Sequence, residues 1–422
     1  MKKITLYEYG RTQGIETLST ELGIPKERLI KTVQEMNVVL KSKLSLDNPF
    51  KLSDNTIRAQ GLAGIISYKG IEIEIVPKFL QPESDDWRED FYFLSNMSKY
   101  GDSMGKVSSQ VSNNKSLFDL IGNEFIMGYL KNHRNIIRKY NKKKYEDFII
   151  HGTLEAETIL MPSEQGFSQT TINLTKKNQY NAVILGAALI LKSLVSNITI
   201  KVKLQKVIDE LSPQDIYKLP IAPLPIRHRK WESVYELSRD ILKLKGNKFG
   251  SGQNTVLGYT VNTWRTWEKF VSSLVSNSFP NQEVLNQHEY SLGIRKPAIE
   301  PVKVKPDSVL LWNTKNGATK IVVDAKYKNT SSRVDLKISE ADIYQSLAFA
   351  TALNSNVIFL IYPHFDSSND ESTRIFERIK IKNVNIVGVG VNVKGISNKN
   401  NRVTIYKEFS KNIKILIRAL LR

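Results

Sequence analysis

Three residues in the last third of the sequence have the types and spacing that phosphodiester hydrolysis requires. Asp307 follows Pro306 directly before an apolar run, and Asp324 and Lys326 end a second apolar run that begins at Ile321. Hard divalent cations prefer oxygen ligands, so two carboxylates can hold Mg²⁺, or Mn²⁺, against a scissile phosphate. A lysine beside the metal can orient the attacking water or stabilise the charge of the transition state. The pattern predicts a metal-dependent nuclease site.

A β-hairpin would bring these three residues together. The runs that follow Asp307 and precede Asp324 are apolar and rich in β-branched residues, and Asn316-Gly317 between them is a strong turn signal. Pairing across that turn places Asp307 and Asp324 at the same end of the hairpin. Asp324 and Lys326, two residues apart, then share one face of their strand. The alternative interpretation is that Asp324 and Lys326 form an ordinary surface ion pair.

Two predicted helices flank the hairpin, and each carries one polar candidate. Residues 264–275 have an apolar stripe at helical spacing with Glu268 at its edge. Glu268 either pairs with a neighbouring basic residue or supplies a third acidic group to the site. Ser339 and Asp342 form a capping box that starts the second helix. Gln345, just after this cap, either faces the predicted metal site or is solvated.

The composition of the whole chain indicates an anionic partner. Its 422 residues contain 61 Lys and Arg against 42 Asp and Glu, a net charge of +19, and nucleic acid is the commonest partner of so basic a protein. The absence of cysteine excludes disulfides, thiolate zinc sites and a cysteine nucleophile. No apolar run reaches the ~20 residues that cross a bilayer, and the N-terminus lacks a signal-peptide pattern. We therefore expect a cytoplasmic protein without a membrane partner.

The patterns along the chain predict an α/β (α+β) fold with three domains. Residues 1–110 read as a β-rich domain, in which the Ile-Glu alternation of residues 71–75 predicts a half-buried hairpin strand. Residues 111–250 read as a mostly helical, basic region. A stretch rich in glycine, asparagine and lysine then marks a boundary, and residues 251–422 contain the candidate nuclease residues.

The densest basic segment of the chain lies in the middle region, with tyrosines interleaved between the cations. Such a segment is either the solvated face of a helix or a contact surface for nucleic-acid phosphates, which gives affinity without sequence information. A second, smaller basic run covers residues 227–230. The candidate DNA-binding residues of the first segment are Lys131, Arg134, Arg138, Lys139, Lys142, Lys143 and Lys144.

These motifs, in this order, resemble the nuclease core of the PD-(D/E)xK superfamily in the version carried by McrC. McrC is the endonuclease subunit of the McrBC restriction systems, and LlaJI-type enzymes are its relatives. The resemblance is carried by Glu268, by Pro306-Asp307, by residues 324–327 (Asp-Ala-Lys-Tyr) and by residues 342–350. Upstream, residues 71–79 resemble a strand and Pro-Lys turn of the family's N-terminal domain.

The resemblance implies a C-terminal core with a mixed central sheet flanked by helices, and Mg²⁺-dependent cleavage of double-stranded DNA. Asp307, Asp324 and the main-chain carbonyl of Ala325 would hold the metal, and Lys326 would assist the attack of water. Glu268 and Gln345 are supporting candidates. The partner would be a hexameric McrB-like AAA+ GTPase, which the N-terminal domain enters and stimulates.

The sequence departs from the family pattern near two of its motifs. Lys305 precedes Pro-Asp where arginine is common, and Thr153 follows Gly152 where arginine is usual. Neither change removes a candidate metal ligand, but both put phosphate contacts at these positions in doubt. The glycines of residues 101–107 do not have P-loop spacing, so GTP would be bound by the partner.

Two other classes of function remain open. One is a non-catalytic adaptor that binds DNA and activates the GTPase. The other is a stand-alone repair or junction nuclease that cuts without a partner or GTP. The presence of Asp307, Asp324 and Lys326 together favours catalysis over the adaptor.

Overall fold

The computed structural model divides the chain into two compact units. The first unit combines residues 1–117 with residues 247–422, and the second comprises residues 118–246. The expected boundaries near residues 110 and 250 fall on residues outside the described ranges, as does the glycine-containing segment 101–107, so those boundaries stay predictions. The described ranges are 2–10, 12–44, 46–53, 55–80, 87–100, 116–211, 223–244, 257–297, 299–314, 317–328, 337–364 and 371–421.

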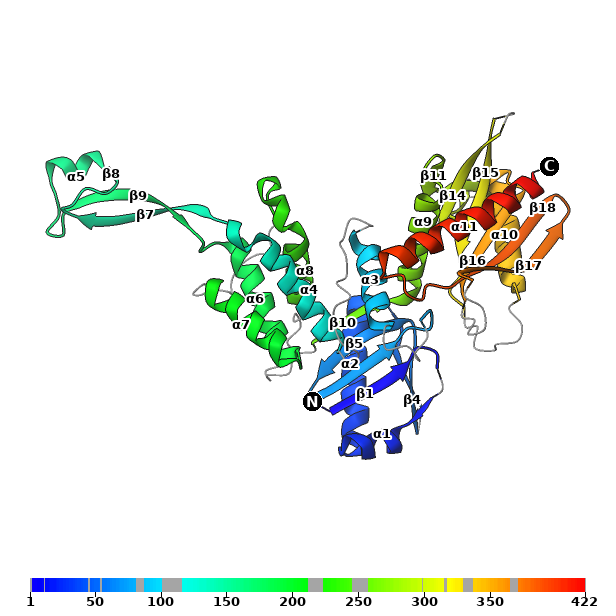
Figure 1. The fold of residues 1–422 in the computed structure, drawn as a ribbon, viewed down its shortest axis with the longest axis horizontal. Helices are drawn as coiled ribbons and strands as arrows, with labels where there is room; N and C mark the ends of the chain where they lie inside the picture. The colour runs from blue at the N-terminus through cyan, green and yellow to red at the C-terminus, as the bar shows by residue number, and fades with distance from the viewer. Residues whose placement is uncertain are drawn as a thin grey trace. The chain divides into compact units, whose positions relative to one another are not determined.

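The N-terminal part of the first unit is built on a four-stranded sheet with the order β1-β6-β5-β10 (Figure 1). The expected hairpin is present as β5 (Leu62–Tyr68) and β6 (Ile71–Val76), and β1 (Lys2–Tyr7) pairs with β6 in parallel. The edge strand β10 (Leu257–Asn262) pairs with β5. The N-terminal sheet is therefore completed by a strand that follows the second unit in the sequence.

Strand β6 is buried on both faces, so the prediction of a half-buried strand is wrong. Glu72 and Glu74 are buried, as are the isoleucines that alternate with them. Arg88 covers this face from helix α3 and donates two hydrogen bonds to the Glu74 carboxylate, at 2.7 and 2.8 Å. The Lys3 ammonium lies 3.0 Å from the same carboxylate. A buried carboxylate requires such partners, and they come from other elements that the alternation alone cannot reveal.

A three-stranded sheet and two helices complete the N-terminal core, in which leucine and isoleucine side chains from both helices and both sheets pack together. Helix α3 comes next in the sequence. These elements are β2 (Gln13–Gly14), α1 (Ile15–Leu22), α2 (Lys26–Leu44), β3 (Phe50–Ser53), β4 (Thr56–Ala59) and α3 (Trp87–Tyr100).

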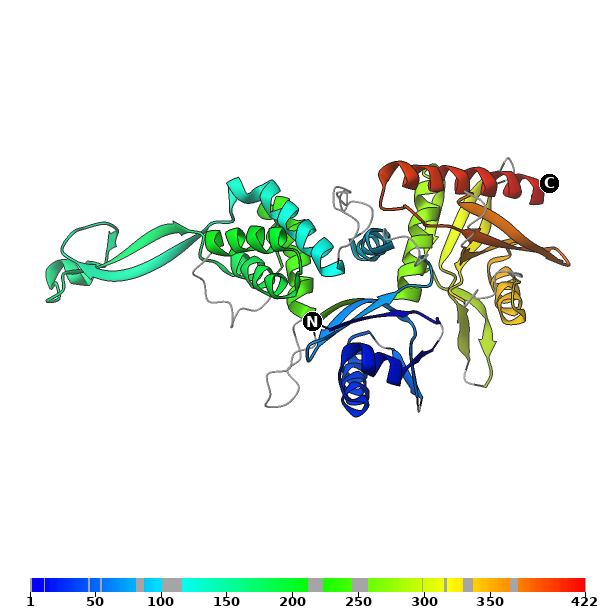
Figure 2. The ribbon, with the colours of Figure 1, turned by 60° about the horizontal axis from the view of Figure 1, so that its bottom comes forward.

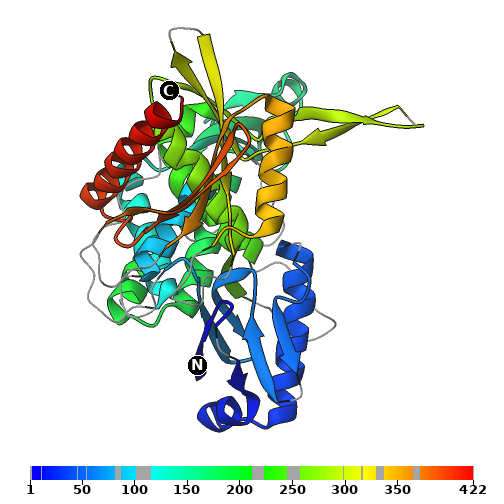
Figure 3. The ribbon, with the colours of Figure 1, turned by 90° about the vertical axis from the view of Figure 1, so that its right-hand side faces the viewer.

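The C-terminal part of the first unit is a mixed six-stranded sheet with helices on both faces, as expected for the fold class. The strand order is β11-β14-β15-β16-β18-β17, and among the described strands of this sheet only β16 forms parallel pairs, with β15 and β18. Helices α10 and α11 cover opposite faces of this sheet, and α9 packs against α11 (Figures 2 and 3). Strands β12 and β13 form a separate two-stranded ribbon.

The bounds of these elements follow the chain order. They are α9 (Thr263–Ser278), β11 (Glu283–Asn286), β12 (Tyr290–Arg295), β13 (Glu300–Val304), β14 (Ser308–Thr314), β15 (Gly317–Ala325), α10 (Glu340–Leu353), β16 (Val357–Pro363), β17 (Thr373–Ile381), β18 (Val384–Val391) and α11 (Lys399–Leu420).

The second unit packs helices α4, α6, α7 and α8 together and extends a long β-ribbon from them (Figure 1). Helix α6 begins at the side chain of Asn178, which accepts hydrogen bonds from the Tyr180 and Asn181 amides. The region is mostly helical, as expected, but the basic run of residues 139–147 is strand β7 and not the solvated face of a helix. Its elements are α4 (Leu117–Asn132), β7 (Lys139–Asp147), β8 (Thr153–Leu154), α5 (Ala156–Leu160), β9 (Phe167–Thr175), α6 (Gln179–Leu194), α7 (Ile198–Leu211) and α8 (Glu232–Leu244), with 3-10 turns at His133–Asn135 and Ile226–Trp231.

The pairing of β7 with β9 explains why this lysine-rich run forms a strand. The nine residues of β7 pair in continuous antiparallel register with the nine of β9, which supplies the β-branched residues Thr170, Thr171 and Ile172. Lysine itself is somewhat depleted in strands, so the pairing with β9 outweighs its own preference. No helix within the described residues is long and apolar enough to cross a membrane.

Candidate active site

The Lys326 ammonium lies at the centre of the candidate site. Its Nζ atom is 2.6 Å from Asp324 Oδ2 and 3.6 Å from Asp342 Oδ1, and it donates a 2.5 Å hydrogen bond to Gln345 Oε1. Only 10% of its side chain is exposed. A strand places Asp324 and Lys326 on one face, as expected, but the pair is buried, so it is not the surface ion pair of the alternative interpretation.

The hairpin of β14 and β15 brings Asp307 to the same place. Ser308 pairs with Val323, so Asp307 and Asp324 are the next residues on either strand, while Asn316 of the expected turn lies outside the described residues. Asp307 Oδ2 accepts a 2.8 Å hydrogen bond from the Ala325 amide, and its Oδ1 accepts one of 2.7 Å from Gln287. Backbone pairing and these two donors fix the first carboxylate beside the second.

Asp342 is a buried member of the cluster that the sequence pattern identified only as a capping residue. The cap itself is as expected, since the Ser339 hydroxyl accepts from the Asp342 amide at 3.3 Å. The Asp342 carboxylate in addition accepts a 3.0 Å hydrogen bond from Tyr362 and lies 2.7 Å from Lys328 Nζ. Tyr362 follows twenty positions later, so no local signal shows this contact.

Helix α9 places Glu268 near the two aspartates. The Glu268 side chain is half-buried, and burial raises its pKa to about 7, helped by the negative charges of Asp307 and Asp324. Arg265 and Lys326 partly offset this rise. Repulsion from both aspartates means that Glu268 belongs to the same charge cluster.

The pKa values of the acidic groups in the cluster shift in opposite directions. Burial and then the Asp324 charge raise the pKa of Asp307 to about 6, and burial also raises the pKa of Asp324 despite Lys326. Burial opposes ionisation of Asp342 as well, but hydrogen bonds from Lys328 and Ser339 outweigh it and lower its pKa. Negative charge therefore exceeds its compensation around Asp307, Asp324 and Glu268, which is an electrostatic environment that favours a cation.

The donor set fits a hard divalent cation that keeps part of its water shell. Within the described ranges, no three acidic or histidine side chains lie close enough to hold an ion by themselves. Asp307 and Asp324 would therefore provide two carboxylate oxygens, and the Ala325 carbonyl is the nearest main-chain candidate. Mg²⁺ is usually bound by one or two carboxylates together with waters and substrate phosphate, so this set is compatible with it.

The carbonyl of Ile361 links helix α9 to the end of β15. It accepts a 3.1 Å hydrogen bond from the Trp267 indole and a 2.8 Å hydrogen bond from the Lys326 amide. Trp267 is buried and directly precedes Glu268. The positions of α9 and of the end of β15 are therefore set by one acceptor on β16.

The candidate DNA-binding cations lie in the second unit, and all of them are exposed. Lys131 lies in the last turn of α4 and Arg134 in the following 3-10 turn. Arg138 directly precedes β7, and the remaining lysines lie along that strand. Because side chains alternate along a strand, the lysines of β7 occupy both faces of the ribbon. Lys144 forms an ion pair with Glu155.

Comparison with known families decides the classification. The model of the family described as McrBC 5-methylcytosine restriction system component matches residues 57–363. The chain belongs to this McrBC family. The match spans the end of the N-terminal domain, the whole second unit and the two strands that carry Asp307, Asp324 and Lys326.

Solved structures show that this family member has the fold of McrC. It is similar to a chain of the Thermococcus gammatolerans tetradecameric assembly of McrB AAA+ hexamers with bound McrC, with a TM-score of 0.75, 17% identity and coverage of 98% of this chain and 100% of that one. It is also similar to a chain of the Thermococcus gammatolerans McrBC complex, with a TM-score of 0.53, 15% identity and coverage of 66% and 88%. No curated protein sequence matches this chain significantly.

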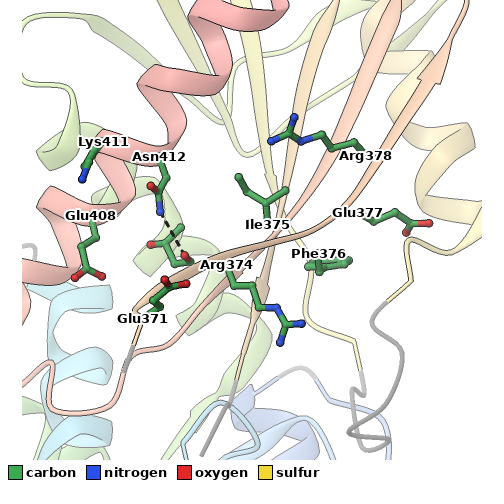
Figure 4. A pocket seen from close by; sticks show the side chains of 10 residues that line it. Glu371, Arg374, Ile375, Phe376, Glu377, Arg378, Glu408, Lys411 and Asn412 are labelled. Atoms are coloured by element: carbon green, nitrogen blue, oxygen red, sulfur yellow. Dashed lines mark hydrogen bonds between the residues drawn. The ribbon is translucent and has the colours of Figure 1, made fainter. Parts of the chain in front are cut away.

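The McrBC family member also has a cavity of about 690 Å³ beside β17 and α11 (Figure 4). Its wall includes Arg374, Arg378 and Lys411 together with Glu377 and Glu408. The acids already have partners, since Glu377 accepts from the Ile338 amide and Glu408 from Ser372. None of the residues that line this cavity belongs to the Asp307–Lys326 cluster, so the cavity is separate from the candidate active site.

Proposed function

We propose that this chain is the Mg²⁺-dependent endonuclease subunit of a McrBC-like, GTP-dependent restriction system. It cleaves double-stranded DNA together with a hexameric McrB-like AAA+ GTPase. The observation that carries the proposal is the convergence of two buried carboxylates and one ammonium, with Lys326 Nζ 2.6 Å from Asp324 and Asp307 bound to the Ala325 amide.

Each residue of the cluster has a defined part in the proposed reaction. Asp307, Asp324 and the Ala325 carbonyl would hold the cation, which would supply Lewis-acid activation of water and offset charge on the phosphate. Lys326 is fixed by Asp324 and Gln345, so its ammonium can orient the attacking water and stabilise the developing negative charge. Glu268, with a pKa of about 7, is suited to take up the proton of that water near neutral pH.

We propose that the two partners bind to different parts of the chain. The Thermococcus gammatolerans assembly contains McrB AAA+ hexamers with bound McrC, and we infer that this chain binds an equivalent hexamer through its N-terminal domain in the cytoplasm. The exposed cations from Lys131 to Lys144 contact DNA phosphates. These contacts would give affinity, and the sequence or base modification recognised is left to other surfaces.

Substitution of the central pair tests the nuclease proposal. Asp324→Ala and Lys326→Ala should each lower the rate of plasmid cleavage by at least about 10³-fold, as expected for loss of a metal ligand or of a transition-state contact. The assay uses the purified chain with its partner, GTP and Mg²⁺ or Mn²⁺. Lys303→Ala is the matched control, because Lys303 forms an exposed pair with Glu289 at 2.9 Å in the same unit.

The same assay separates the alternative functions. Unchanged cleavage by Asp324→Ala or Lys326→Ala would refute the assignment of the site. Stimulation of the partner's GTPase without any cleavage by the wild-type chain would identify an adaptor. Cleavage without partner or GTP would identify a stand-alone nuclease.

A further inference from the structure

A buried carboxylate of the N-terminal domain reaches the residue next to the catalytic lysine. Glu8, which follows β1, is 3% exposed. Its Oε1 accepts a 2.5 Å hydrogen bond from the Thr263 hydroxyl, and its Oε2 accepts one of 2.5 Å from the Tyr327 hydroxyl and one of 3.1 Å from the Lys78 amide. Three donors from three different segments therefore converge on one side chain.

Two of these donors belong to the elements that carry the catalytic residues. Thr263 is the first residue of α9, and Glu268 lies little more than one turn further along the same helix. Tyr327 directly follows Lys326. Any displacement of the Glu8 carboxylate would therefore act on both catalytic elements through the polypeptide backbone.

Aromatic contacts reinforce the same junction. Phe79, just after β6, stacks on Trp267 with ring centroids 6.2 Å apart and meets the Tyr327 ring edge-on at 5.9 Å. The Lys78 ammonium lies 3.9 Å from the centre of the Tyr327 ring. Tyr327 is therefore contacted by three residues of the N-terminal domain, Glu8, Lys78 and Phe79.

The junction is formed by buried polar groups, whereas packing alone would favour apolar side chains there. A buried carboxylate and a nearby ammonium cost desolvation free energy, and apolar residues of the same size often stabilise an interface as well or better. A fully hydrogen-bonded polar network, in contrast, fixes one geometry of its members. A nuclease needs such precision, since a misplacement of about 1 Å in a catalytic group can lower the rate about 100-fold.

We propose that Glu8 is a positioning residue of the nuclease, which holds Tyr327 and Thr263 so that Lys326 and Glu268 face the scissile phosphate. The proposal rests on the nuclease function proposed above. Glu8 acts through Tyr327 and Thr263 and does not touch the substrate. The N-terminal domain is accordingly a structural part of the active site as well as the proposed docking domain.

Two substitutions with a matched control test this role in the full-length chain with its partner. Glu8→Gln keeps the size of the side chain but removes its charge, and Tyr327→Phe removes one hydroxyl. The control is Asp90→Asn, because Asp90 is another buried carboxylate that joins the N-terminal part to the C-terminal part. It accepts hydrogen bonds from the Gly395 amide at 2.7 Å and from the Ser397 amide and hydroxyl at 3.0 and 2.7 Å, and neither residue adjoins a catalytic residue.

The expected result separates positioning from stability. Glu8→Gln and Tyr327→Phe should lower kcat for plasmid cleavage about 10- to 100-fold, with KM for DNA and stimulation of the partner's GTPase changed less than about twofold. The double variant should lose no more than the stronger single variant, because both changes break the same contact. Asp90→Asn should lower Tm but keep kcat within about twofold.

Three outcomes would overturn the proposal. These are an unchanged kcat in both Glu8→Gln and Tyr327→Phe, an equal loss of kcat in Asp90→Asn, or a loss that appears only in KM. If Glu8→Gln does not fold, Tyr327→Phe alone decides, since it removes a single oxygen atom. Failure of the nuclease proposal itself looks different, because the wild-type chain would then not cut, or Asp324→Ala would cut as well as the wild type.

Discussion

The two units of this McrBC family member use charge in opposite ways. In the first unit, Lys326, Asp324 and Asp342 are buried and each has a partner within hydrogen-bond or ion-pair distance. In the second unit, the lysines of β7 are exposed along a ribbon. Buried charges keep one geometry because each needs its partner, and exposed charges act by their number and are screened by salt. The first arrangement suits chemistry and the second suits attraction of a polyanion.

The largest effect that tests this contrast is on DNA affinity. Replacing Lys139, Lys142 and Lys143 with glutamine should weaken DNA binding about 10- to 100-fold near 0.15 M salt. The slope of log K against log salt should shrink by about 3, because each phosphate contact contributes about 0.9. Fluorescence anisotropy over a salt series measures both quantities. Cleavage at saturating DNA should stay close to the wild-type rate, since these exposed side chains are outside the candidate active site.

A matched set of lysines controls for net charge. Helix α7 of the same unit carries Lys201, Lys203 and Lys206, and their replacement with glutamine removes the same charge from another surface. This variant should keep a slope within about 1 of the wild type. Equal slopes for the two triple variants would contradict the contrast between the units.

A smaller effect concerns a buried carboxylate of the second unit. Asp119 accepts hydrogen bonds from the Ser196 and Asn197 amides, at 2.9 and 3.1 Å, and from the Ser196 hydroxyl at 2.6 Å, just before α7 begins. Asp119→Ala should lower the free energy of unfolding by about 2 kcal/mol, because two amides lose their acceptor. Urea titration measures this loss. Nuclease activity of the folded fraction should not change, in contrast to Asp324→Ala, and a catalytic loss would argue against a structural role.

The smallest effect distinguishes two glutamates with the same titration range. Burial alone raises the pKa of Glu124, in the second unit, to about 7, whereas at Glu268 the aspartates add to burial and the pKa is also about 7. In both cases the folded state binds more protons than the unfolded state between pH 4.5 and 7. The free energy of unfolding therefore falls as pH rises through this window.

Glutamine at either position should remove that loss and raise stability at pH 8 by about 1 kcal/mol, after allowance for partial exposure. Thermal unfolding at pH 5 and pH 8 without metal measures it. Addition of Mg²⁺ should then stabilise the wild type and reduce the difference at Glu268, where a cation offsets the repulsion. The difference at Glu124 should persist, and an equal response of both positions would contradict a metal site beside Glu268.

The parts of the site that the sequence predicted depend on contacts within one hairpin. Apolar β-branched runs on either side of a turn identified β14 and β15, and their pairing places Asp307 beside Asp324. The capping box at Ser339 likewise identified the start of α10. In each case the signal and the structure it predicts lie within about twenty residues.

The features that the sequence did not predict depend on partners from distant segments. Asp342 is held by Tyr362, and Glu8 by Thr263 and Tyr327, so neither contact has a local pattern. Burial of Glu74 requires Arg88 from α3. Tertiary packing determines the burial and the partners of these carboxylates. A pattern of residue types along the sequence predicts only that charged side chains are exposed to solvent.

The origin of β10 has a consequence for how the protein is made. This strand pairs with β5 at the edge of the N-terminal sheet, yet it begins at Leu257. During synthesis the N-terminal sheet lacks its edge strand β10 until the ribosome has added the entire second unit. Until then the backbone groups of β5 that face β10 have no strand partner. A fragment that stops at residue 110 would lack β10, so the edge of β5 would stay unpaired and the fragment should aggregate.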